Sequence, residues 1–144
     1  MAKVETPTVD ALSRAHTSLQ KDLRELEEAG HTASEKGLPG LRSRLKSTRK
    51  HIAEHFRFEE QGGYMDAVRK REPRLGRVID ELCTEHGQLL SSLDAILKET
   101  AAAPSINDLI SKEVSGWISR MRQHESRENQ IAQDAFNLDI GPED

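Results

Sequence analysis

The chain has 144 residues, a formal net charge of −4 and one cysteine. Apolar residues make up 35% of the sequence and charged residues 32%, while one Trp, one Tyr and three Phe are too few to fill a β-sandwich or a doubly wound sheet. Helices that pack through Leu, Ile and Ala need few aromatic side chains, so the composition favours an all-α domain.

The sequence also excludes several classes of protein. It has no stretch near the roughly 18 consecutive apolar residues of a membrane span, and Met1 to Pro7 lacks the layout of a signal peptide. Cys83 permits no internal disulfide, as is typical of a reducing compartment. We therefore expect a cytoplasmic monomer or small homo-oligomer that binds neither nucleic acid nor membrane; the sequence identifies no protein partner.

Helix-breaking residues divide the chain into four long segments. Gly30, Gly37 to Gly40, Gly62-Gly63, Pro73 and Pro104 leave expected helices at about 8–29, 38–61, 74–99 and 105–136. A further helical turn is expected around Tyr64 to Arg69, and Ser105 with Asp108 has the form of a capping box.

Connections of this length make successive helices antiparallel neighbours, so the segments predict an up-down-up-down antiparallel four-helix bundle. We expect a single domain over residues 1–144, with its core at about 8–136 and short flexible termini.

Each expected helix has an apolar seam with steps of three and four residues, and polar side chains interrupt every seam. The first seam runs through Val9, Leu12, His16, Leu19, Leu23 and Leu26. The polar seam residues of the whole chain are His16, His55, Glu59, His86, His124 and Glu128. An unpaired buried polar group costs roughly 2–7 kcal/mol, so the recurrence on all four helices needs a reason.

These six residues are expected to lie at similar heights. At about 1.5 Å of rise per residue, His16 and His55 lie roughly 12 Å and 9 Å from the bundle end that they share. The same arithmetic places His86, His124 and Glu128 roughly 10 to 18 Å from that end. The six side chains therefore fall in one half of the bundle and form one layer.

A layer of four imidazoles and two carboxylates suits a dinuclear metal centre. His55 with Glu59, and His124 with Glu128, are spaced i, i+4 and share a helical face. We expect His16 and His55 to bind one metal, His86 and His124 the other, and both glutamates to be shared. Nitrogen and oxygen donors without thiolate favour iron, and manganese next, over structural zinc.

The Glu-x-x-His pattern of ferritin-like di-iron bundles is absent, because Ile52, Cys83 and Met121 stand three residues before His55, His86 and His124.

At these positions the sequence resembles the hemerythrin-like family, also called the HHE cation-binding domain. The resemblance rests on His16, on His55-Phe-Arg-Phe-Glu59 followed by Glu60, on Glu85-His86-Gly-Gln-Leu-Leu90 and on His124-Glu-Ser-Arg-Glu128, and it spans about residues 9–136. It implies two non-haem iron ions with an oxo or hydroxo bridge. Family members bind dioxygen, sense oxygen or iron, handle nitric oxide or peroxide, or repair iron–sulfur clusters.

One departure from the oxygen carriers of that family affects the expected function. Carriers have two histidines one turn apart on the third helix, whereas Leu82 stands four residues before His86 here. Both metals would then have open positions. We expect a protein that binds or senses dioxygen, nitric oxide or peroxide. The alternatives are an enzyme that decomposes peroxide or handles nitric oxide, and a metal-free helical interaction module.

Several neighbours have accessory roles to be tested. His51 is a candidate fifth imidazole, although it lies off the seam, and Tyr64 could hydrogen-bond to an oxygen ligand of the metal or pack over the bundle end. Glu60 and Glu85 flank the ligands without sharing their faces, so we interpret them as salt-bridged surface groups, with contact to the metal or to a ligand as the alternative for each and Glu60 as a candidate accessory residue. Cys83 is interpreted as a small buried thiol.

Overall fold

The computed structural model describes residues 5–32 and 34–136, with side chains from residue 13 onward. Four long helices dominate it: α1 (Glu5–Ala29), α2 (Gly37–Gln61), α4 (Gly76–Ala102) and α5 (Asp108–Phe136). A short helix α3 (Tyr64–Arg71) and a single 3₁₀ turn η2 (Pro73–Leu75) connect α2 to α4. The expected flexible termini, and the side chains of Val9 and Leu12, lie outside the described residues.

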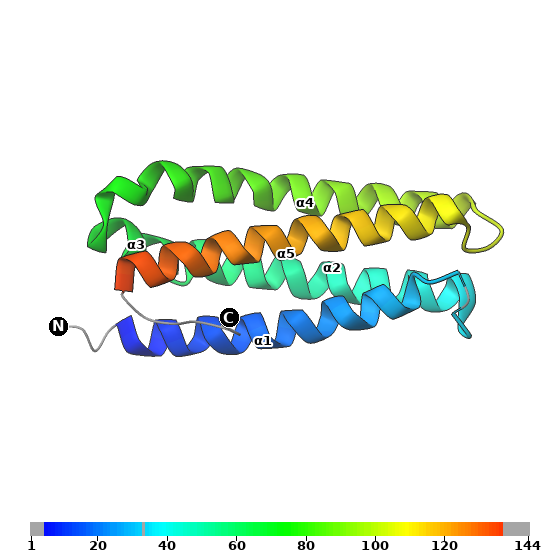
Figure 1. The fold of residues 1–144 in the computed structure, drawn as a ribbon, viewed down its shortest axis with the longest axis horizontal. Helices are drawn as coiled ribbons and strands as arrows, with labels where there is room; N and C mark the ends of the chain where they lie inside the picture. Colours follow the sequence, from blue (N-terminus) through cyan, green and yellow to red (C-terminus); the bar gives the residue numbers. More distant parts are fainter. Residues whose placement is uncertain (1–4, 33, 137–144) are drawn as a thin grey trace.

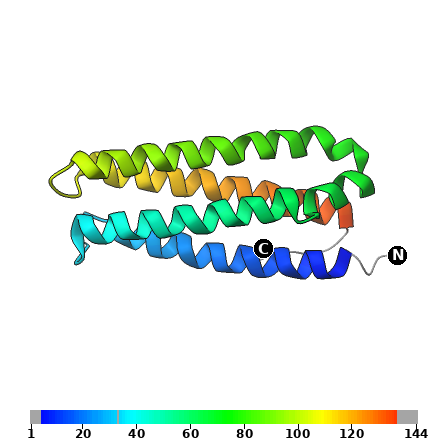
Figure 2. The ribbon, with the colours of Figure 1, turned by 180° about the vertical axis from the view of Figure 1, so that it is seen from behind.

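The four long helices form an up-down-up-down bundle (Figure 1). Helix α1 packs against α2 and α5, and α4 packs against the same two helices, so the four form a closed ring. The connections α1–α2 and α4–α5 lie at one end and α3 lies at the other, as the reverse view also shows (Figure 2). The all-α four-helix fold expected from the sequence is confirmed.

Two helix starts differ by three residues from the expected ones. Helix α1 begins at Glu5 instead of residue 8, and α5 begins at Asp108 instead of residue 105. The expected capping box at Ser105 is wrong because Asn107 caps α5: its side-chain Oδ1 accepts the backbone N–H of Ile110 at 2.8 Å.

Helix α3 closes the end of the bundle. Gly63 enters it with φ of +98°, a left-handed conformation that glycine adopts without strain, so the chain reverses sharply after α2. Tyr64, Met65 and Val68 then turn inward and are buried. The helical turn expected around Tyr64 to Arg69 is present, and its apolar face covers the bundle end.

The buried apolar side chains form two separate clusters. The larger cluster lies toward the α1–α2 and α4–α5 connections and includes Leu23, Leu45, Leu93 and Trp117. The smaller cluster lies under α3 and includes Tyr64, Leu82 and Ile131 among its members. The polar seam residues predicted from the sequence lie between these clusters, so they divide the core.

Within residues 5–32 and 34–136, no helix combines the length and the apolar character that crossing a bilayer requires.

Candidate metal centre

Six polar side chains from the four long helices meet in the layer between the two apolar clusters. Helix α1 contributes His16, α2 contributes His55 and Glu59, α4 contributes His86, and α5 contributes His124 and Glu128. Each is at most 7% exposed, and both glutamates are fully buried. The four backbones bring these residues together because each stands on the apolar seam of its helix.

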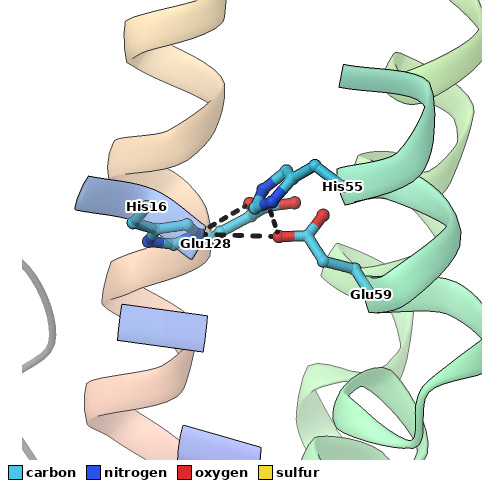
Figure 3. A group of neighbouring side chains, drawn as sticks. All are labelled: His16, His55, Glu59 and Glu128. Carbon is cyan, nitrogen blue, oxygen red and sulfur yellow. Dashed lines mark ion pairs between the residues drawn. The ribbon is translucent and has the colours of Figure 1, made fainter. Parts of the chain in front are cut away.

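The six side chains form two overlapping groups. His16, His55, Glu59 and Glu128 each offer one ligand atom, and these four atoms lie within 4.8 Å of one another. Glu59, His86, His124 and Glu128 meet the same criterion. Figure 3 shows the first group, in which the two imidazoles face the two carboxylates. Both groups contain Glu59 and Glu128, so the two carboxylates stand between two pairs of histidines.

Each shared carboxylate presents a different oxygen to each pair of histidines. Glu59 places Oε2 3.1 Å from His55 Nε2 and Oε1 3.2 Å from His86 Nε2. Glu128 places Oε1 3.5 Å from His16 Nε2 and Oε2 2.8 Å from His124 Nε2. All four histidines therefore direct Nε2 inward, and each of the two carboxylates faces both pairs of histidines.

Many of these polar atoms have no hydrogen-bond partner within the protein. Both ring nitrogens of His16 and of His55, both carboxylate oxygens of Glu59 and one oxygen of Glu128 are buried and unsatisfied. Buried polar atoms are nearly always hydrogen-bonded, so this concentration in one layer is abnormal for an ordinary core. Imidazole and carboxylate donors without thiolate fit iron or manganese, and a cation would satisfy these atoms together.

The His86 and His124 rings are held from outside the layer. His86 Nδ1 lies 2.5 Å from Glu60 Oε2, and His124 Nδ1 lies 2.8 Å from Glu85 Oε1. Glu85 is itself paired with Arg127. The carboxylates accept the Nδ1–H of each ring, so the inward Nε2 is the nitrogen that a cation would bind once it displaces the Nε2 proton, as in most protein sites where histidine binds metal.

Phe56 adds a further constraint on this pair. Its ring stacks on that of His86, with centroids 3.8 Å apart and planes 10° apart, and it meets His124 edge-on at 5.6 Å. Phe56 is buried between α2 and α4. The His86 ring is thus restrained both at Nδ1 and across its face.

The His16 and His55 rings lack such anchors. Neither Nδ1 atom has a hydrogen-bond partner, although the two ring centroids are 5.3 Å apart. A third carboxylate, Glu125, is 1% exposed and interacts electrostatically with both rings. Gln20 Nε2 donates to Glu125 Oε1 at 3.3 Å, while Oε2 is unsatisfied. This side of the layer is equally buried but less constrained.

The electrostatics of the layer favour charged side chains. Burial lowers the pKa of His16, but the carboxylates of Glu128 and Glu59 raise it by more, to about 10. Burial lowers the pKa of His86 too, and Glu128, Glu59 and Glu60 raise it to about 10. Burial raises the pKa of Glu128, yet the surrounding histidines bring it well below its ordinary value. A cation that binds at neutral pH must therefore displace protons from imidazoles.

His51 and Tyr64, two residues for which the sequence suggests accessory roles, have hydrogen-bond partners other than a metal ligand side chain. His51 Nδ1 lies 2.9 Å from Asp22 Oδ2, and among the described residues His51 belongs to neither group of four. Tyr64 is fully buried, and its hydroxyl donates to the backbone carbonyl oxygen of Glu128 at 3.1 Å. Burial raises the pKa of Tyr64 well above its ordinary value, so the hydroxyl stays protonated. Its visible role is to hold the backbone that presents Glu128.

Glu60 and Glu85 are ion-paired and partly exposed, as the sequence predicts, and they also have a second kind of contact. Both are partly solvent-accessible, but each also contacts a histidine on another helix, which the spacing along a single helix does not reveal. Cys83 is only half-buried, and it lies with Glu60 and His86 within 4.8 Å. Burial, followed by the nearby charge of Glu60, raises the pKa of the Cys83 thiol, so it is held as a neutral thiol.

Sequence reasoning missed Phe56 and Glu125. Phe56 follows His55 directly, and Glu125 follows His124 directly, so each lies beside the seam and faces a neighbouring helix. Adjacency to a seam histidine is the signal that could have drawn attention to them.

Comparison with known protein families agrees with this geometry. Residues 8–136 match the family model of the hemerythrin HHE cation-binding domain. The chain belongs to this family. Searches of curated proteins and of solved structures returned no significant match. The resemblance inferred from the sequence is therefore confirmed at the level of the family. The family implies that the chain binds a cation, and the His/Glu layer contains two groups of residues that could hold one.

Proposed function

We propose that the protein is a non-haem di-iron protein that binds or senses dioxygen, nitric oxide or peroxide. The observation that supports this proposal best is the orientation of Glu59 and Glu128, which each direct one oxygen toward each pair of histidines. Two separate mononuclear sites would not need shared carboxylates. His16 and His55 would hold one iron, and His86 and His124 the other. Manganese is the next candidate, because it accepts the same donors.

Iron in such a centre supplies redox chemistry and positions at which a small molecule can bind. Each group offers four protein ligand atoms, fewer than six-coordinate iron accepts. The residues of the chain orient the cations, exclude bulk water through burial, and hold the Nδ1 protons of His86 and His124 on Glu60 and Glu85. The centre would lie between two apolar clusters, where an uncharged diatomic molecule is soluble.

One observation favours an enzyme as the alternative function. Leu82 is fully buried in the apolar cluster under α3, at the place where an oxygen carrier has a second histidine on this helix. Without that histidine both metals would keep open positions, which suits turnover of peroxide or nitric oxide better than reversible oxygen storage. The alternative uses the same ligands and differs in what happens after the small molecule binds.

Anaerobic reconstitution with ferrous iron tests the proposal. We expect two iron ions per chain by elemental analysis, and an absorption spectrum that changes on addition of dioxygen or nitric oxide. Fewer than one iron per chain after reconstitution would contradict the di-iron centre and favour a metal-free interaction module. Hydrogen peroxide added to the loaded protein separates the remaining functions, since oxygen evolution well above that of free iron indicates a peroxide-decomposing enzyme.

A further inference from the structure

A surface hollow between α1 and α2 leads to the less constrained side of the centre. Asp22 of α1 and His51, Glu54 and His55 of α2 line it. Of these, His55 also belongs to the centre, so the hollow connects solvent with one of the proposed ligands.

Asp22 and His51, which we name the outer pair, both line this hollow. His51 Nδ1 lies 2.9 Å from Asp22 Oδ2, and the side chains are 47% and 12% exposed. An imidazole and a carboxylate from neighbouring helices are donors that suit a divalent first-row cation.

The donors of α2 continue inward from the outer pair. His51, His55 and Glu59 follow one another at intervals of one helical turn, and their side chains are 47%, 5% and 0% exposed. His55 Nδ1 is buried without a hydrogen-bond partner, and its Nε2 faces Glu59 Oε2 at 3.1 Å. A row of donors thus extends from solvent to the shared carboxylate.

The charge around the hollow also favours a cation. Asp22 and Glu54 provide negative charge there. A second hollow, between α4 and α5, reaches His124 and is lined by Arg120 and Arg127 together with Glu85. Since charged walls attract ions of opposite sign, a cation approaching the centre would be drawn to the α1–α2 side.

We propose that Asp22 and His51 form an uptake site that captures a divalent cation from solvent and passes it to His55. The transfer exchanges one imidazole ligand for another one turn further along the same helix, with no change in oxidation state. This inference rests on the proposed function, since it assumes that His55 belongs to a metal centre.

Metal-loading kinetics test the uptake site. Co²⁺ is mixed with the metal-free protein, and the appearance of its visible absorption is followed by stopped flow. In Asp22→Asn and in His51→Gln we expect the loading rate to fall about tenfold, the lower end of the range for electrostatic steering. The final number of cobalt ions per chain should equal that of the wild type, because neither residue belongs to the two groups of four.

Asp94→Asn provides the matched control, since Asp94 is an exposed carboxylate of α4 paired with Arg49 at 2.6 Å. It should load at the wild-type rate. An unchanged rate in the outer-pair variants, or an equal slowing in Asp94→Asn, would overturn the uptake site. A lower final cobalt content in the outer-pair variants would also overturn it, because the pair would then belong to the centre.

A second measurement separates this inference from the proposed function. Substoichiometric Mn²⁺ should broaden the imidazole NMR signals of His51 in the wild type and in Glu59→Gln/Glu128→Gln, which lacks both shared carboxylates. Broadening in the double variant, with no cobalt at its centre, would support cation binding by the outer pair itself. If the wild type also showed broadening but took up no cobalt at the centre, the di-iron proposal would be refuted while cation binding by the outer pair would stand. Unaffected His51 signals in both proteins would overturn the uptake site even if the centre binds two metals.

Discussion

The two pairs of histidines differ in how firmly the protein holds them. His86 and His124 have Glu60 and Glu85 at Nδ1, and Phe56 stacks on one of their rings. His16 and His55 are equally buried, yet their Nδ1 atoms have no hydrogen-bond partner. The first pair is therefore organised before any cation arrives, whereas the second depends on the cation for its order.

This difference implies an order of binding. A carboxylate at Nδ1 fixes the orientation of the imidazole ring and increases the basicity of Nε2. Because Glu60 and Glu85 act in this way on His86 and His124, that side should bind its cation more tightly. The His16/His55 side adjoins the proposed uptake hollow and should exchange its cation more readily. One centre would thus combine a retained metal with a replaceable one.

The largest effect on stability should come from removing the cations or one of the carboxylates that the two sides share. Chelation of both cations, or Glu128→Gln, should lower the free energy of unfolding by about 4 kcal/mol per site at a cation concentration 1,000 times Kd. Urea denaturation with and without metal measures this loss, and Glu27→Gln, an exposed carboxylate, serves as control. Retention of one full metal by Glu128→Gln would show that the sides bind independently, and equal stability with and without metal would contradict coordination at the layer.

Replacement of Glu125, which lies beside His16 and His55, should change the free energy of unfolding in opposite directions in the metal-free and the metal-loaded protein. Burial raises the pKa of Glu125 from 4.5 to about 7, against the attraction of His16 and His55. Between these values the folded metal-free protein holds a proton that the unfolded chain has released, so its stability falls as pH rises.

At pH 8 the buried carboxylate of Glu125 is ionised and lowers the stability of the metal-free protein, whereas glutamine carries no charge. The change in the free energy of unfolding caused by Glu125→Gln should therefore be more favourable at pH 8 than below pH 4.5, by about 3 kcal/mol. In the loaded protein nearby cations favour the ionised carboxylate, so the same variant should be destabilising. Denaturation curves of both forms at pH 8, and of the metal-free form also below pH 4.5, provide the measurement. The same sign in both forms would exclude an electrostatic contact between Glu125 and the bound metals.

Variants of Glu60 and Glu85 should affect mainly the side of the centre that contains His86 and His124. Glu60→Gln and Glu85→Gln should each weaken one of the two cation affinities by about 10- to 100-fold and leave the other unchanged. Competition with a chelator of known affinity resolves the two steps. Asp80→Asn, which removes an exposed carboxylate of α4 paired with Arg69, should change neither affinity. Equal weakening of both affinities would remove the distinction between the sides.

The smallest effect is expected at Tyr64. Tyr64→Phe removes the hydrogen bond to the Glu128 carbonyl and should lower stability by about 1 kcal/mol, with two metals still bound. Thermal denaturation and metal analysis of the variant are sufficient. Loss of a metal would instead indicate that the hydroxyl acts at the centre itself.

The sequence was sufficient for the fold because the seams and helix breakers are local signals. His16, His86 and the two His-x-x-x-Glu pairs occupy positions where Leu or Ile would be expected, so the polar layer follows from the periodicity alone. The start of α5 was misplaced because Asn107 and Ser105 both suit a helix cap, and only the backbone geometry selects between them.

The surroundings of the layer could not be predicted in the same way. Glu60 contacts a histidine of α4, and Glu85 contacts a histidine of α5, so both roles depend on how the helices are rotated against each other. The partner of His51 is a residue of α1, for the same reason. Periodicity identifies which face of a helix is buried, but the contacts of residues at the edge of that face require the packed bundle.

The division of the core into two apolar clusters affects the cooperativity of unfolding. The polar layer separates the cluster under α3 from the larger one, so apolar contacts alone do not make the molecule a single cooperative unit. Cations that tie all four long helices together would supply that connection. Metal occupancy should therefore determine whether the molecule unfolds in one transition or in two, with the α3 end opening first.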